Sequence, residues 1–402
     1  MVEVFRSLRS RNFRLFFIGQ TTSLIGTWMQ RIALSYYIYR TTGSPFLLGL
    51  TDFLSQIPAL FLGMVGGIVA DRTSKKNLFI TTQTLALIQA LLLSLFTNTD
   101  KPFIPLIIIL GFFLGVINSF DMPARNALIP LMIENKEDIS NAIAMVGMMV
   151  NMARIIGSSI GGFVIEHFGE YFCFILNAIS FAFVILTLFF VRIREEKDNV
   201  MTGSLISSLR EILGYVKQKR TILITLSLFT ITNLLAMPYV ISMTIFARDV
   251  LGLSAKALGI ILSALGIGAI IAGFIVASLK NTSFIGRLVP IPAIITGIAY
   301  ITTAISPGFT IALITSAIIG LSLTSSIILT NSFIQILVPD SLRGRIMGIY
   351  TSLFIGIAPI GSLIIGLLAE HVGIIKTLIL IGSITILSGI IATLIIYRSN
   401  KE

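Results

Sequence analysis

The sequence is poor in charged residues and in the side chains that build most enzyme active sites. Asp, Glu, Lys and Arg make up 12% of its 402 residues, whereas a typical globular domain carries about 25%. Cys173 is the only cysteine and there are two histidines, so no disulfide within the chain and no cysteine-rich metal cluster is expected. A Walker phosphate loop and a nucleophile–base arrangement are both missing. We therefore expect no enzyme, no cofactor, no metal site and no ATP-driven machine.

Long apolar runs take the place of the missing charges. Apolar residues make up 55% of the chain, and the mean hydropathy is +0.97. Each run is long enough to cross about 30 Å of hydrocarbon as a helix, and none alternates in polarity as a transmembrane strand would. The predicted fold class is an all-α membrane protein with twelve transmembrane helices, at about 13–39, 46–70, 78–96, 103–120, 143–165, 171–191, 222–246, 258–279, 288–305, 309–337, 346–369 and 378–397.

The net charge of +11 is explained by membrane topology. Most Lys and Arg residues fall at alternate ends of the predicted helices, as in the loop Arg72–Lys76 and the stretch Arg192–Arg220. Such a bias places those loops and both termini in the cytoplasm. Some attraction to anionic lipid is compatible with it, and nucleic-acid binding is not needed. The first apolar run is too long for a cleavable signal peptide, and we expect a monomer in the lipid bilayer.

The two halves of the chain resemble each other around a hydrophilic middle. Ile165–Gly169 and Ala369–Gly373 share a Glu-His-x-Gly pattern 204 positions apart, which is typical of a transporter built from parallel repeats. Duplication explains the paired histidines better than a metal or proton-sensing site does. The predicted domains are a six-helix bundle over 1–195, a cytoplasmic linker over 196–220 and a second six-helix bundle over 221–402. Within the linker, 205–217 has the spacing of an amphipathic surface helix; a flexible linker is the alternative.

Several short motifs carry a resemblance to a known family. They are Gly67-x-x-x-Asp71-Arg72-x-x-Lys75-Lys76, Gly157-Ser158-Ser159-Ile160-Gly161-Gly162, Phe5–Phe16, Asn118–Arg125, Asn151–Gly157 and Pro339–Arg345. Together they resemble the major facilitator superfamily and, within it, the bacterial drug:proton antiporters that include the enterobactin exporter and macrolide efflux proteins. Ser74 stands where the first motif usually has Gly, and Ser158 stands where the antiporter motif of helix five usually has Pro.

The resemblance implies a location, a mechanism and a set of roles. It implies the cytoplasmic (inner) membrane of a bacterium, with helices one, four, seven and ten lining a cavity between the bundles. It also implies a conformational latch in which Asp71 faces the start of helix eleven and Lys75 meets Asp121. The residues of this latch are Gly67, Asp71, Arg72, Lys75, Asp121 and Arg125, and those of the antiporter-like motif are Gly157, Ser158, Gly161 and Gly162.

Ionisable side chains inside the predicted spans are costly and therefore candidates for function. Arg31 lies on a polar face of helix one with Gln20 and Thr27, and Asp52 lies near the same end of helix two, so Arg31 and Asp52 can pair. Such a pair would either respond to protons and substrate or lock two helices together. Arg154 of helix five has no partner by sequence and is a candidate anion- or proton-coupling cation.

The predicted activity is proton-coupled export of an amphipathic small molecule, such as a drug, a macrolide or a siderophore-like compound, by alternating access. A cavity rich in Phe and Met with few charges suits such compounds. Two alternatives stay open: an importer or lysolipid flippase of the same fold, and a non-transporting membrane scaffold or sensor. The candidate substrate-binding residues are Gln20, Thr27, Asn118, Asn151, Asn233 and Thr324.

Overall fold

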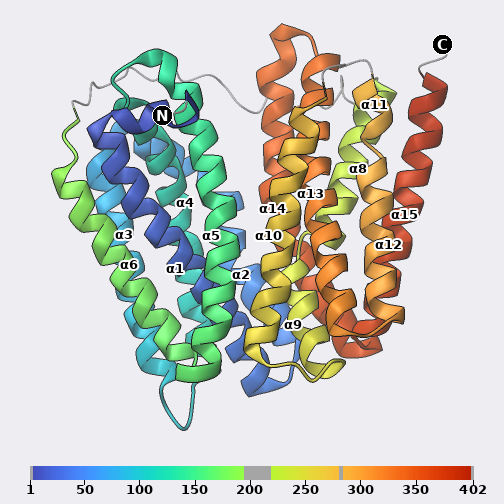
Figure 1. Ribbon diagram of the computed structural model, residues 1–402, viewed down its shortest axis with the longest axis horizontal. Helices are drawn as coiled ribbons and strands as arrows, with labels where there is room; N and C mark the ends of the chain where they lie inside the picture. The colour runs from blue at the N-terminus through green and yellow to red at the C-terminus, as the bar shows by residue number, and fades with distance from the viewer. Residues whose placement is uncertain (1–2, 194–218, 280–283, 400–402) are drawn as a thin grey trace. The chain divides into compact units, whose positions relative to one another are not determined.

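The computed structural model describes residues 3–193, 219–279 and 284–399, and all regular structure in these residues is helical (Figure 1). The predicted amphipathic helix at 205–217 lies outside the described residues. The first half of the chain contains η1 (Glu3–Arg9), α1 (Arg11–Thr42), α2 (Pro45–Arg72), α3 (Lys75–Thr97), α4 (Ile104–Leu131), η2 (Lys136–Asp138), α5 (Ile139–Phe168) and α6 (Glu170–Phe190). The second half contains α8 (Arg220–Ala236), α9 (Tyr239–Asp249), α10 (Ala255–Ala277), α11 (Ile285–Leu288), α12 (Ile291–Ile305), α13 (Phe309–Leu337), α14 (Asp340–Val372) and α15 (Ile374–Ser399).

Eleven spans in the described chain are long and apolar enough to cross a membrane, judged by length and composition. Helix α1 is not among them, although it has 32 residues. Its buried face carries polar side chains, including those of Gln20, Ser23, Gln30 and Ser35, which lower its hydropathy. The structure therefore supports an all-helical membrane protein with eleven clear spans, and α1 is a long polar-faced helix packed among them.

Local sequence explains where the helices begin, end and break. Gly43, with a φ of 64°, ends α1 in the left-handed conformation that glycine adopts without steric cost. Ser74 caps α3, because its side chain accepts a hydrogen bond from the Asn77 amide. The expected single run 222–246 is broken into α8 and α9 at Pro238, which has no amide hydrogen to donate. Likewise, Pro290 separates α11 from α12.

The chain forms two compact units. Unit 1 consists of 1–43, 50–200 and 253–263, and unit 2 of 44–49, 201–252 and 264–402. Unit 1 therefore includes the first turns of α10, and unit 2 includes the first turn of α2. Within unit 1, α1 packs on α5 and α6, and α3 packs on α4 and α6; within unit 2, α12 packs on α13 and α15.

Neutral polar side chains join the helices of unit 1 in its buried interior. Ser180 donates to Asn177 Oδ1 at 2.9 Å, and Asn177 donates to Gln30 Oε1 at 2.8 Å. Gln30 donates to Gln89 Oε1 at 3.1 Å, and Gln89 donates to the Leu110 carbonyl at 3.1 Å. This amide chain links α6, α1, α3 and α4. Buried amides need such partners, especially in a membrane, where water cannot satisfy them.

Candidate functional site

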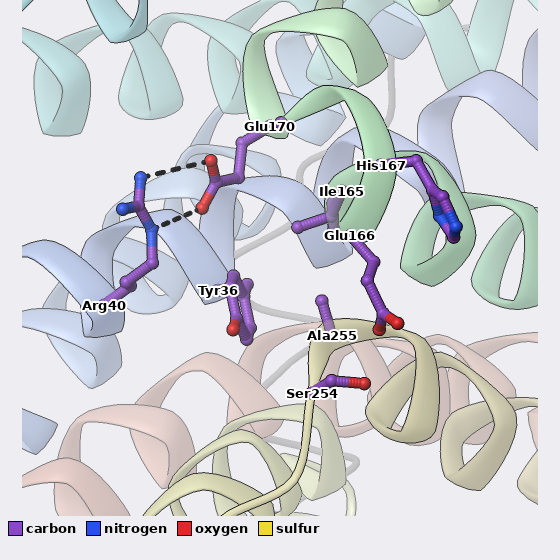
Figure 2. A pocket seen from close by; sticks show the side chains of 9 residues that line it. Tyr36, Arg40, Ile165, Glu166, His167, Glu170, Ser254 and Ala255 are labelled. Carbon is purple, nitrogen blue, oxygen red and sulfur yellow. Dashed lines mark hydrogen bonds and ion pairs between the residues drawn. The ribbon is translucent and has the colours of Figure 1, made fainter.

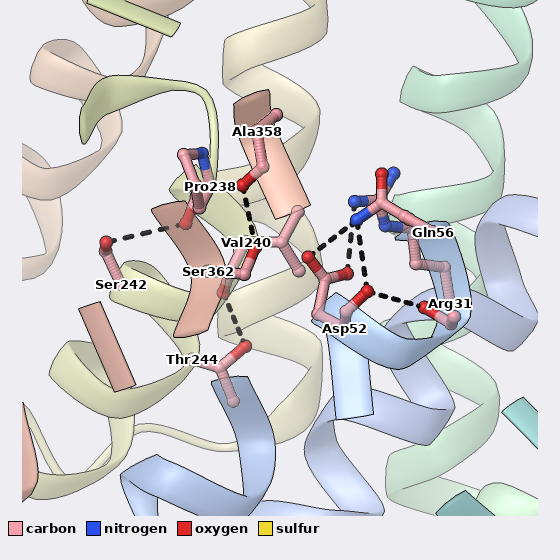
Figure 3. A network of polar contacts seen from close by, with 10 residues as sticks. Arg31, Asp52, Gln56, Pro238, Val240, Ser242, Thr244, Ala358 and Ser362 are labelled. Atoms are coloured by element: carbon pink, nitrogen blue, oxygen red, sulfur yellow. Dashed lines mark hydrogen bonds and ion pairs between the residues drawn. The ribbon is translucent and has the colours of Figure 1, made fainter. Parts of the chain in front are cut away.

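The charged side chains predicted inside the spans of the first half gather in unit 1 around α1, α2 and α5. Arg31 Nη2 donates to Asp52 Oδ1 at 3.3 Å, so the predicted pair between helices one and two forms (Figure 3). Gln56, one turn further along α2, donates to the other carboxylate oxygen of Asp52 at 2.7 Å. The side chain of Asp52 is 7% exposed and that of Arg31 is 36% exposed. A nearly buried carboxylate is thus held by one cation and one neutral amide.

Arg154 of α5 joins this group through the indole of Trp28. Its guanidinium carbon lies 4.8 Å from the centroid of the Trp28 ring, and that of Arg31 lies 5.4 Å from it. Both distances fall in the range of cation–π attraction. Arg154 Nε is buried and has no hydrogen-bond partner in the described part of the chain. We refer to Trp28, Arg31, Asp52, Gln56 and Arg154 as the charged cluster.

Gly157 and Gly161 of the antiporter-like motif place α5 against α1 beside this cluster. A Cβ on Gly157 would lie 2.5 Å from the Ile25 carbonyl oxygen and 2.7 Å from Trp28 Cβ. A Cβ on Gly161 would lie 3.2 Å from Met29 Cα. Small residues here let the two helices approach closely, and this approach brings the Arg154 side chain to the Trp28 ring.

Gly162 and Ser158 of the same motif face a different helix, the start of α10. A Cβ on Gly162 would lie 2.6 Å from the Ala255 carbonyl oxygen and 3.0 Å from Gly259 Cα. The carbonyl of Ser158 packs on Gly259, and the Ser158 side chain is buried. The motif therefore packs α5 on α1 and on the start of α10 mainly through backbone contacts, and the Ser159 hydroxyl adds a hydrogen bond with the Ser263 hydroxyl of α10 at 2.7 Å.

The predicted latch residues lie around the α2–α3 connection and the neighbouring part of α4. Asp121 accepts hydrogen bonds from Thr82 Oγ1 at 2.9 Å and Gln83 Nε2 at 2.7 Å. These two α3 side chains take the place that the family resemblance gave to Lys75, and no ion pair between Lys75 and Asp121 occurs among the described residues. The reason is local: Asp121 is 7% exposed, and its contacts on α3 lie about two helical turns beyond Lys75.

The other latch residues are placed as follows. Asp71 and Arg72 are exposed at the end of α2, and a Cβ on Gly67 would meet no atom within 4 Å. Arg125 Nε is buried without a hydrogen-bond partner in the described residues. Lys76, next to Lys75, donates to the Val191 carbonyl at 2.6 Å and so satisfies the end of α6. The predicted contact of Asp71 with the start of helix eleven stays a prediction.

The six candidate substrate-binding residues differ in their surroundings. In unit 1, Thr27 and Asn151 donate to carbonyls of their own helices, those of Ser23 and Gly147, while Asn118 is exposed. In unit 2, Thr324 is half-buried. Gln20 Oε1 and Asn233 Oδ1 are buried oxygens that lack a hydrogen-bond partner among the described residues. The six residues are divided between the two units, and their role in substrate binding stays a prediction.

A separate pocket of about 460 Å³ opens in unit 1 where α5 and α6 meet (Figure 2). Arg40 Nε and Nη2 form a two-pronged ion pair with the Glu170 carboxylate, at 2.7 and 3.2 Å. Glu166 also lines the pocket, and its carboxylate accepts a hydrogen bond from the Lys256 amide at 3.1 Å, in the first turn of α10. These ion-pair and capping roles were not predicted from the sequence. For the capping role, the sign in the sequence is a Glu in the last turn of each helix that carries the repeated Glu-His motif.

Solved structures of membrane transporters share this fold. A mutant of the nucleoside transporter NupG matches with a TM-score of 0.77 at 13% identity, covering 96% of this chain and 99% of that one. A mutant of the peptide transporter POT matches with a TM-score of 0.76 at 12% identity, covering 99% of both chains. These matches show that the described chain has the all-helical fold of solved membrane transporters.

The family follows from the sequence as a whole. The model of the transmembrane secretion effectors matches residues 3–401, and the chain belongs to this family of major facilitator transporters. The staphyloferrin A transporter of Staphylococcus aureus is 25% identical over 97% of this chain and 96% of its own. Macrolide efflux protein A of Streptococcus pyogenes is 21% identical over 95% of both, and the enterobactin exporter EntS of Shigella boydii is 23% identical over 88% and 84%. The predicted family and the prediction of a transporter, not an enzyme, are confirmed.

Proposed function

We propose that this transporter exports an amphipathic small molecule from the bacterial cytoplasm in exchange for protons. Siderophores, macrolides and other drugs are the candidate substrate classes, since relatives along almost the whole chain are named for them. The observation that carries the coupling is the charged cluster of unit 1, in which the nearly buried Asp52 carboxylate contacts Arg31. Protonation of Asp52 would remove its negative charge and release Arg31, which gives one proton a direct effect on two helices.

The proposed architecture has twelve spans, with α1 as the first. Its polar face is buried against α5 and α6, so a membrane span is compatible with the low hydropathy of α1. We place one six-helix half in 1–195, a cytoplasmic linker in 196–220 and the second half in 221–402. The two halves would alternate in opening to either side of the inner membrane, in a monomer with both termini in the cytoplasm.

The orientation in the membrane can be tested by cysteine labelling, because the single native cysteine should not react. Cys173 is 0% exposed, so a membrane-impermeant maleimide should react with introduced cysteines only. Thr73→Cys, between α2 and α3, should be protected in intact cells and labelled after permeabilisation. Thr99→Cys, between α3 and α4, should be labelled in intact cells. The opposite labelling pattern would reverse the proposed orientation.

Transport and coupling are tested in proteoliposomes with an imposed pH gradient. The wild-type protein should move at least one compound from a panel of siderophores and macrolides, and movement should stop when the gradient is collapsed. Asp52→Asn should lose the dependence on the gradient, while Asp100→Asn, in the loop after α3, should retain it. Movement of a panel compound that ignores the gradient and the Asp52 substitution would refute proton coupling through Asp52.

The conformational latch is a further part of the proposal. Asp71→Asn should slow transport without reducing the amount of protein in the membrane, because Asp71 is exposed at the end of α2 and makes no contribution to a buried core. Thr73→Asn, two residues further along and also exposed, is the matched control. Normal transport by Asp71→Asn would remove the latch from the mechanism.

A further inference from the structure

The charged cluster contains more positive than negative charge. Arg31 and Arg154 both lie within 5.4 Å of the Trp28 ring centroid. Asp52 is the carboxylate of the cluster, and it is paired with Arg31. Arg154 forms no ion pair in the part of the chain that the structure describes, and its electrostatic neighbour is the like charge of Arg31. One cation is therefore uncompensated inside the helical bundle of unit 1.

A purely structural role does not account for this arrangement. A cation inside a membrane protein is costly unless a carboxylate or a ligand balances it, and a second guanidinium close by raises that cost because like charges repel. The Trp28 ring offsets part of the cost through cation–π attraction. The Arg154 Nε–H has no acceptor among the described residues, and a hydrogen bond that a buried charged group does not form is itself unfavourable.

Part of the cluster is exposed in the structure. Arg31 is 36% exposed, and Trp28 and Arg154 are half-buried. A guanidinium offers several N–H donors in a planar fork that matches a carboxylate or another oxyanion. The indole of Trp28 offers a flat apolar surface between α1 and α5. An anionic group would balance the extra charge, whereas an ammonium group would meet the repulsion of the uncompensated cation.

We propose that Arg31 and Arg154, gathered at Trp28, bind the carboxylate or a similar oxyanion of the transported molecule. This inference rests on the proposed export of an amphipath and narrows its substrate class to anionic amphipaths over amine drugs. The apolar or aromatic body of the substrate would lie along the Trp28 ring, and the missing counter-charge of Arg154 would arrive with the substrate. Asp52 would compete with that anion for Arg31.

Trp28 is the only tryptophan of the chain, so its fluorescence reports on this site alone. Binding can be measured with purified protein in detergent as energy transfer from Trp28 to a dansyl group. The probes are a dansyl amino acid, which is an anion, and dansylcadaverine, which carries an amine. The anion should give saturable transfer with an affinity at least tenfold higher than that of the amine.

Substitutions then assign the affinity to the two cations. Arg154→Gln should weaken binding of the anion at least tenfold, Arg154→Lys should restore part of it, and Asp52→Asn should strengthen it. Arg14→Gln, at an exposed position of α1, should bind as the wild type does. Unfolding temperatures of each variant identify any that fail to fold, and Arg31→Gln then provides the second test of the site.

The result that overturns the inference is equal binding of both probes, or unchanged binding of the anion by folded Arg154→Gln and Arg31→Gln. Transport in proteoliposomes separates this from failure of the proposed function. Export of amine compounds that ignores both substitutions would contradict the anion site and leave export standing. Anion binding that depends on Arg154, in a protein that moves no compound, would contradict export and leave the site standing.

Discussion

The contact of α5 with the start of α10 provides a sharp test of the packing, because its central residue has almost no room to grow. A Cβ on Gly162 would lie 2.6 Å from the Ala255 carbonyl oxygen and 3.0 Å from Gly259 Cα. Ordinary carbon contacts need about 3.5 Å, so Gly162→Ala must push the helices apart by most of an ångström or be strained. The obstacles are backbone atoms of a helix, which cannot rotate away as a side chain can.

The magnitude follows from two opposing effects. Overpacking of a close contact costs about 1–3 kcal/mol. Replacing Gly by Ala in a helix interior contributes about 1 kcal/mol in the other direction. Both clashing atoms, the Ala255 carbonyl oxygen and Gly259 Cα, belong to the backbone. We therefore expect an overpacking cost in the upper part of its range and a net loss of stability of about 1–2 kcal/mol. For a unit of this size, each kcal/mol lowers the unfolding temperature by about 2–4 °C.

The assay uses a dye that becomes fluorescent on reaction with a thiol, with Cys173 as the reporter. Cys173 is the only cysteine and is 0% exposed, so the signal appears when unit 1 unfolds. The matched control is Gly147→Ala in the same helix, where an added Cβ would meet no atom within 4 Å. It should keep or raise the unfolding temperature. If Gly162→Ala raises the unfolding temperature as Gly147→Ala does, the close approach of α5 and α10 is wrong.

Two further predictions concern the hydrogen bonds of each unit. Gln30→Leu should lower the unfolding temperature of unit 1, because the Asn177 and Gln89 side chains each lose a buried partner at a cost of about 1 kcal/mol or more. Thr22→Val, on the exposed side of the same helix, is the control. Equal unfolding temperatures of the two variants would contradict the amide chain. Glu370→Gln should weaken the cap that Glu370 places on the Phe46 amide and the Ser44 hydroxyl at the start of α2, and the loss in unfolding temperature should shrink at high salt because it comes from charge at a helix N-terminus. A loss that does not depend on salt would assign the effect to packing.

The sequence was a good guide wherever a charge had to be balanced inside an apolar run. Arg31 and Asp52 could be paired in advance, because each lies near the same end of its predicted helix and an isolated charge in a membrane demands a partner. The same reasoning predicts no carboxylate partner for Arg154, and none pairs with it among the described residues. What it did not anticipate is the Trp28 ring, since an aromatic residue in an apolar run carries no signal that separates a cation–π partner from an ordinary packing residue.

Neutral partners were beyond such reasoning. The family resemblance implies a contact between Asp121 and Lys75, whereas Asp121 accepts hydrogen bonds from Thr82 and Gln83. The hydrogen bonds among Gln30, Gln89 and Asn177 were likewise not predicted, because these side chains carry no charge. An amide inside an apolar helix nevertheless indicates that a partner helix carries another polar group. The break at Pro238 was readable from the chemistry of proline, and the division into α8 and α9 follows it.

The repeated Glu-His motif shows what duplication preserved. In unit 1, Ser158, Gly162 and Glu166 follow one another at four-residue intervals along α5; the first two contact the start of α10 and the Glu166 carboxylate caps it. In unit 2, Ser362, Gly366 and Glu370 repeat this arrangement along α14 against the start of α2, where a Cβ on Gly366 would lie 2.6 Å from the Pro45 carbonyl oxygen.

The histidine side chains of the motif form hydrogen bonds within their own helices. His167 and His371 each bond a carbonyl of the preceding turn, those of Phe163 and Leu367, and no cluster of metal-ligating residues occurs among the described residues. In both copies the glutamate caps the facing helix, because its carboxylate accepts hydrogen bonds at a helix N-terminus that has unpaired amides and a partial positive charge. A serine, a glycine and a glutamate on one helix face thus form the same contact twice, once from α5 and once from α14.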